Sequence, residues 1–147
     1  MEIINGDIFT CKEEIIVHQT NCMGVMGSGL AAQVKKKYPD VFKGYYHFCK
    51  TKQLNELLGN VLICETDDGK YIANVFGQGN YGTDKQYTDY DALRKGLKDV
   101  RDFAKERNLS VAIPYKIGCG LGGGDWNTVF EMITDIFADV PTNIYRK

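Results

Sequence analysis

The chain has 147 residues, a length typical of one domain and sufficient to bury a core without disulfides or metal. Apolar residues make up 44% and charged residues 25% of the sequence, and the formal net charge is −1. This charge argues against a broad nucleic-acid-binding face, which would carry a basic excess. No apolar run approaches the roughly 20 residues that a membrane span requires.

In chain order the sequence predicts strands at residues 2–5 and 14–19, a helix from 28 to 37 that resumes after Pro39, strands at 60–65 and 71–75, a helix at 88–106, a strand at 110–115, a helix from Asp125, and a last strand at 143–145. The runs Ile15–Val17 and Val111–Ile113 are apolar without alternation, which is typical of central strands covered on both faces. We therefore expect residues 1–147 to form a single α/β domain. Its central sheet should be mixed and largely parallel, flanked by helices in three layers.

The cysteines are odd in number and scattered, and none forms a Cys-x-x-Cys pair: Cys11, Cys22, Cys49, Cys64 and Cys119. This usage predicts reduced thiols in a reducing compartment and no zinc site. The segment Met1–Asp7 lacks the basic start and apolar stretch of a signal peptide. We therefore expect a cytoplasmic protein with no membrane segment, no metal and no cofactor.

Two glycine-rich segments lie between a predicted strand and a predicted helix. The first, residues 23–29, follows the strand that ends near Gln19, and the second, residues 118–124, follows the strand that ends near Ile117. Such a segment offers successive backbone amides and a helix N-terminus to an anion, although glycines also make plain turns. Because the carboxyl ends of neighbouring strands share one crevice, two such segments favour a diphosphate held from both sides. No Gly-Lys-Ser/Thr motif is present, which argues against a P-loop ATPase.

Polar residues near these segments supply the candidate chemistry. His18 at a strand end is either a structural hydrogen-bonding residue or a general acid or base. Asn21 either holds ligand hydroxyls or simply starts a turn. Asp7 follows the first strand, where it binds an adenine amine or stabilises a turn. Asp125 is expected to cap the helix that follows it, and Lys35–Lys37 to form a solvated face.

Residues 17–31 and 113–126 resemble the first and second ligand loops of macrodomains, and Asn5–Ile8 fits the opening of the same family. The resemblance covers nearly the whole chain and implies ADP-ribose as the ligand. It implies that Asp7 binds the adenine amine, that Ile8 makes a nearby backbone contact, and that Asn21 meets the distal ribose. The diphosphate would be surrounded by Gly27, Ser28, Gly29, Gly118, Cys119, Gly120, Leu121 and Gly122. Tyr145 is either a wall of the adenine pocket or part of the sheet packing.

The chain is similar to a compact branch of macrodomains. This branch includes terminal ADP-ribose protein glycohydrolases, DNA ADP-ribosyl glycohydrolase antitoxins and the fungal ADP-ribose-1''-phosphate phosphatase. Its glycohydrolases use a lysine where this sequence has Gln78, and the protein glycohydrolase has an aspartate where Gly122 stands. The absence of an amine at position 78 argues against the lysine-dependent mechanism, unless Lys85 on the following stretch takes its place.

Phosphatase-type members of this branch carry a histidine at the position of His18. The resemblance therefore favours a hydrolase that acts on ADP-ribose-1''-phosphate, with His18 and Asn21 as catalytic residues. His18 would protonate the leaving ribose oxygen or activate the attacking water, and Asn21 would hold the distal ribose. Two alternatives stay open. One is a non-catalytic ADP-ribose-binding module, and the other is a glycohydrolase that acts on ADP-ribosylated protein or nucleic acid by a lysine-independent route.

Overall fold

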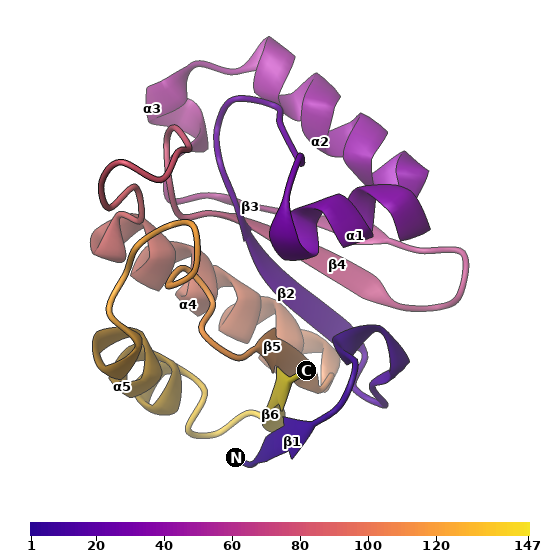
Figure 1. Ribbon diagram of the computed structural model, residues 1–147. Helices are drawn as coiled ribbons and strands as arrows, with labels where there is room; N and C mark the ends of the chain where they lie inside the picture. Colours follow the sequence, from indigo (N-terminus) through magenta and orange to yellow (C-terminus); the bar gives the residue numbers. More distant parts are fainter.

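The computed structural model describes all 147 residues. It has a six-stranded sheet with helices on both faces (Figure 1). The strands lie in the order β1-β6-β5-β2-β4-β3, and every neighbouring pair is parallel except β3 and β4. Their bounds are β1 Ile3–Asn5, β2 Ile15–Thr20, β3 Val61–Glu65, β4 Tyr71–Phe76, β5 Val111–Pro114 and β6 Thr142–Arg146. The predicted mixed, largely parallel α/β fold is confirmed.

The helices divide between the two faces of the sheet, as Figure 1 shows. Their bounds are α1 Gly29–Lys37, α2 Pro39–Thr51, α3 Leu54–Leu57, α4 Tyr90–Arg107 and α5 Trp126–Ile136, with a short 3-10 helix, η1, at Ile8–Thr10. One hydrophobic cluster lies under α4 and α5, and a second lies under α1, α2 and α3. None of these helices combines the length and apolarity needed to cross a membrane.

Strand β2 joins the two hydrophobic clusters at the centre of the sheet. Ile15 and Val17 pack in the cluster under α4 and α5, whereas Ile16 packs in the cluster under α1 and α2. All three side chains are fully buried, because successive side chains of a strand point to opposite faces and both faces here are covered. The same alternation directs His18 and Gln19, at the end of the strand, to opposite sides of the sheet.

The structure differs from the sequence prediction in several details. The helices η1 and α3 are not predicted, because segments of three and four residues show no helical periodicity. Strand β5 ends at Pro114, and a turn over residues 115–119 leads from it into the second glycine segment. Within this turn Lys116 has a φ of 63°, a left-handed conformation that is uncommon for residues other than glycine. The predicted cap at Asp125 is present, because its carboxylate accepts from the Thr128 amide.

Candidate functional site

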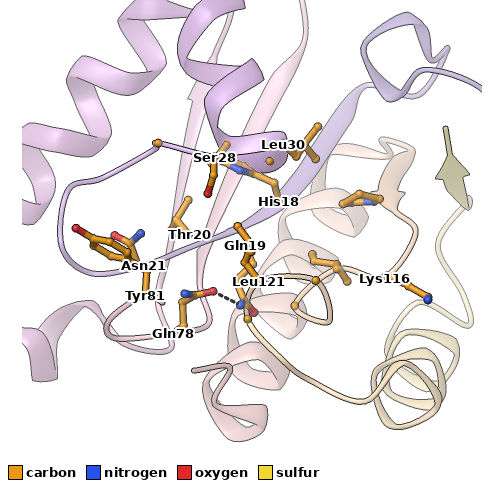
Figure 2. Close-up of a pocket in the computed structure, with 18 of the residues that line it drawn as sticks. His18, Gln19, Thr20, Asn21, Ser28, Leu30, Gln78, Tyr81, Lys116 and Leu121 are labelled. Carbon is orange, nitrogen blue, oxygen red and sulfur yellow. Dashed lines mark hydrogen bonds between the residues drawn. The ribbon is translucent and has the colours of Figure 1, made fainter. Parts of the chain in front are cut away.

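A cavity of about 510 Å³ lies at the carboxyl ends of β2 and β5 (Figure 2). Its wall comprises residues 18–21, 25, 27–31, 78, 81–83, 114–118 and 120–122. The two glycine segments therefore line one cavity, at the edge of the sheet where ligands of α/β proteins bind. Lys116 is the one residue of this wall with a fixed charge, and the wall contains no aspartate or glutamate. The volume and the charge suit an anionic ligand of nucleotide size.

The first glycine segment leads into helix α1, and the amides just before the helix are unoccupied. The backbone amides of Gly27 and Ser28 donate to no other backbone group. The Ser28 side chain makes no capping bond to the first turn of α1, and that turn contains no acidic residue. The amides of a first helical turn have no partner within the helix and lie at the positive end of its dipole. This end of the cavity therefore offers several donors to an anion.

Asn21 organises the first glycine segment through its side chain. Its Oδ1 accepts from the Met23 amide at 2.9 Å and from the Tyr45 hydroxyl at 2.8 Å, and its Nδ2 donates to the Val25 carbonyl at 2.9 Å. The Tyr45 ring is fully buried on α2 and stacks on Phe76. Asn21 thus has the turn-forming role that the sequence left open, and one Nδ2 hydrogen is left to reach a ligand.

The second glycine segment presents a matching row of amides. The backbone amides of Gly118, Gly120, Leu121 and Gly122 donate to no other backbone group. Gly118 has a φ of 73°, which a residue with a side chain rarely adopts. A Cβ atom added at Gly120 would meet no atom within 4 Å, so this residue borders open space on the cavity side. The segment combines free donors with room for a ligand to approach the backbone.

His18 lies in the cavity wall with its side chain almost fully buried. Its Nε2 is 2.7 Å from Asn74 Oδ1, and its Nδ1 has no hydrogen-bond partner. Because Asn74 donates its Nδ2 to the Leu62 carbonyl, its oxygen faces His18, and the proton of the neutral ring is on Nε2. Burial lowers the pKa of His18 to about 4, against the smaller opposing effect of the Asn74 hydrogen bond. At neutral pH His18 is therefore uncharged, and its Nδ1 is an acceptor.

Position 78 carries an amide whose two ends are both occupied. Gln78 Oε1 accepts from Gln19 Nε2 at 2.7 Å, shown as a dashed line in Figure 2, and Gln78 Nε2 donates to the Asn80 carbonyl at 2.8 Å. Lys85 does not line the cavity, and its ammonium lies over the Tyr87 ring, 5.2 Å from the ring centre. Gln78 carries no amine, and the Lys85 ammonium does not line the cavity, so no amine occupies the predicted nucleophile position in this structure.

Four residues predicted to bind the ligand lie outside the cavity wall. Asp7 caps η1 by accepting from the Phe9 amide, which lowers the pKa of its carboxyl group, and Ile8 packs in the cluster under α1 and α2. Cys119 donates its thiol to the Ile117 carbonyl, and burial raises its pKa to about 11. Tyr145 is buried, and its hydroxyl contacts the Glu13 carboxylate. Contacts from Asp7, Ile8, Cys119 and Tyr145 to a ligand stay predictions.

Several residues in the cavity wall are absent from the sequence-based candidates. Gln19, Thr83 and Lys116 line the cavity, as does Tyr81, which is half exposed. Lys116 could have been noticed as the basic residue just before the second glycine segment. The other three carry no motif, because polar residues of these types occur throughout surface loops. The structure has no group of three or more His, Cys, Asp or Glu side chains that could hold a metal ion.

Comparison with known proteins identifies the family. The Macro domain model matches residues 17–133. The chain is 33% identical over 141 residues to a DNA ADP-ribosyl glycohydrolase of Mycobacterium tuberculosis, a match that covers 93% of this chain but only 38% of that protein. It is 30% identical over 159 residues to an ADP-ribose 1''-phosphate phosphatase of Lodderomyces elongisporus, covering 99% of this chain and 97% of that protein.

A solved structure supports the same assignment. The macrodomain of Mycobacterium tuberculosis DarG superposes with a TM-score of 0.82 at 33% sequence identity, covering 95% of this chain and 93% of that chain. The family match includes the end of β2, both glycine segments and most of α5. The order of the elements, the cavity between the glycine segments and these matches agree, and the chain belongs to the Macro domain family.

Proposed function

We propose that residues 1–147 act as one macrodomain that binds ADP-ribose or its derivatives, with the diphosphate between the two glycine segments. The observation that carries this proposal is the set of free backbone amides on both sides of one cavity, together with the start of α1. No acidic side chain lines the cavity to oppose a diphosphate. Relatives named for ADP-ribosyl and ADP-ribose-phosphate chemistry support the same ligand.

The chemistry we propose is hydrolysis of ADP-ribose-1''-phosphate. A relative named as an ADP-ribose 1''-phosphate phosphatase, 30% identical over 99% of this chain, supports it. Gln78, with both amide ends occupied, argues against a lysine-type nucleophile at that position. In the proposed step, water attacks the phosphorus, the bond between phosphorus and the ribose oxygen breaks, and that oxygen takes up a proton. The products are ADP-ribose and inorganic phosphate.

Of the two catalytic roles predicted for His18, we propose the second. A ring with a pKa of about 4 holds no proton to donate at pH 7, so protonation of the leaving oxygen is disfavoured. In the other role Nδ1, which is unpartnered but buried, accepts a hydrogen bond from the attacking water once the cavity wall shifts to expose it. Asn21 would contribute its remaining amide hydrogen to the distal ribose. We also propose a cytoplasmic location, based on the cysteine usage described above.

The test combines calorimetry with ADP-ribose and an assay of phosphate release from ADP-ribose-1''-phosphate. We expect binding and slow turnover by the wild-type chain, and loss of turnover with retained binding in His18→Ala. An unchanged rate in His18→Ala would remove its catalytic role. Tight binding without release of phosphate would favour a binding module, and activity only on an ADP-ribosylated protein or nucleic acid would favour a glycohydrolase. No binding at millimolar ligand would refute all three.

A further inference from the structure

A chain of hydrogen bonds connects three segments of the cavity wall through Gln19. Gln19 Nε2 donates to Gln78 Oε1 at 2.7 Å and to Thr88 Oγ1 at 2.9 Å, and the Thr88 hydroxyl donates to the Gly118 carbonyl at 2.7 Å. Gln19 lies one residue before the end of β2, Gln78 and Thr88 lie in the segment that follows β4, and Gly118 begins the second glycine segment. The network thus joins three segments that are far apart in the sequence.

Thr88 holds the second glycine segment at two points, Gly118 and Gly122. Its side chain binds the Gly118 carbonyl, and its backbone amide donates to the Gly122 carbonyl at 3.0 Å. Thr88 is buried, so these bonds are shielded from water. The free amides of this segment belong to Gly118 and Gly122, which Thr88 holds, and to Gly120 and Leu121 between them. The conformation of this row of donors therefore depends on Thr88.

The orientation of the Gln19 amide follows from its partners. The Thr88 hydroxyl has one proton, which goes to Gly118, so toward Gln19 it can only accept. Both hydrogens of Gln19 Nε2 are thereby used, and Oε1 is buried without a partner. A Cβ atom at Gly77 would overlap this oxygen, and a Cβ atom at Gly122 would overlap the Thr88 hydroxyl. Glycine at these two positions makes room for the network.

We infer that Gln19 is a positioning residue that orients Thr88 onto the second glycine segment and requires an acceptor at position 78. A lysine at 78 would bring its ammonium against the Gln19 amide nitrogen, donor to donor. Any side chain at 122 would displace the Thr88 hydroxyl. A neutral network, in which every donor hydrogen of Gln19 is paired, thus occupies the space that an amine at 78 and a carboxylate at 122 would need. This inference rests on the proposed function only in the experiment that measures ADP-ribose affinity, and not in the one that measures melting temperature.

The first experiment compares Thr88→Val with Thr88→Ser by calorimetry with ADP-ribose. Valine has a similar shape but no hydroxyl, whereas serine keeps it. We expect the dissociation constant to rise by about tenfold in Thr88→Val, the upper range for one hydrogen bond, and by less than about twofold in Thr88→Ser. Affinity for adenosine, which has no phosphate, should be equal in both variants. Equal ADP-ribose affinity in both variants, or a parallel loss for adenosine, would overturn the role of Thr88.

The second experiment tests Gln19 without a ligand, using melting temperatures. Gln19→Glu places a carboxylate against the Gln78 oxygen, and Gln78→Lys places an ammonium against the Gln19 nitrogen, so each variant should melt at a lower temperature. The double variant pairs the carboxylate with the ammonium and should melt above the value expected from adding the two losses. Additive losses would refute the requirement for an acceptor at 78. A wild-type chain that does not bind ADP-ribose would refute the proposed function, and this cycle would still decide the inference.

Discussion

Gly120 provides the sharpest test of the diphosphate site, through the variant Gly120→Glu. A Cβ atom at this position meets nothing within 4 Å, and the φ of Gly120 lies outside the left-handed region that excludes side chains. The fold should therefore tolerate the substitution, and the new side chain should extend into the space beside the cavity. Loss of binding without loss of stability would then report on the ligand site alone.

The size of the effect follows from charge and bulk. A carboxylate about 5 Å from one phosphate charge costs about 0.8 kcal/mol at the dielectric constant of water and about 3 kcal/mol at an effective value near 20. Each charge pair thus weakens binding by about fourfold to about 200-fold, and steric overlap with the diphosphate adds to this. Gly120→Gln has the same shape without the charge, so it measures the steric part separately.

The assay is calorimetry with ADP-ribose at low and high salt, with melting temperatures as the control for folding. We expect Gly120→Glu to lose binding at low salt and to recover part of it at high salt, because salt screens exposed charges. Gly120→Gln should bind more tightly than Gly120→Glu at low salt and show little dependence on salt. Wild-type affinity in a folded Gly120→Glu variant would refute the assignment of this segment to the diphosphate.

Three further variants test other parts of the site and the fold. Tyr45→Phe keeps the buried ring and removes the hydroxyl that holds Asn21, so ADP-ribose affinity measured by calorimetry should fall by about two- to tenfold. Unchanged affinity would show that the Tyr45 hydroxyl does not contribute to ligand binding. Asp125→Ala should lower the melting temperature, because it removes the cap of α5, and Asp125→Asn should restore most of the loss. For His18 the folded chain has a pKa of about 4 and the unfolded chain an ordinary value near 6.5, so protonation favours unfolding. The free energy of unfolding should therefore fall by about 3 kcal/mol as the pH drops from 6.5 to 4, and urea titrations should give a smaller fall in His18→Gln.

Local sequence patterns were sufficient for most of the fold. The apolar runs at Ile15–Val17 and Val111–Ile113 correspond to the two central strands β2 and β5, and the helices α4 and α5 lie where the helical spacing of apolar residues predicts them. The glycine segments were recognised because glycine is rare inside regular elements. That these segments line a common cavity followed from the rule that the carboxyl ends of parallel strands share an edge.

The roles of individual side chains depended on partners that sequence patterns do not reveal. Gln19 and Thr88 are 69 residues apart, and nothing local indicates that their side chains meet. His18 was expected either as a structural hydrogen-bonding residue or as a general acid or base, and nothing local indicates that burial beside Asn74, 56 residues away, lowers its pKa. Long-range burial and pairing, rather than residue type, set the contacts and the charge of these side chains.

The positions of the free amides, rather than their number, separate the two glycine segments from plain turns. The amides of Gly27 and Ser28 on one side, and those of Gly118, Gly120, Leu121 and Gly122 on the other, donate to no backbone group and belong to residues of one cavity wall. Other groups of the same segments are tied down: the Met23 amide donates to Asn21, and the Gly118 and Gly122 carbonyls accept from Thr88. These bonds hold the free amides in place for a ligand, because the loop backbone cannot turn them inward to pair. Such a surface favours an anion through the backbone, with Lys116 as the one fixed positive charge in the wall.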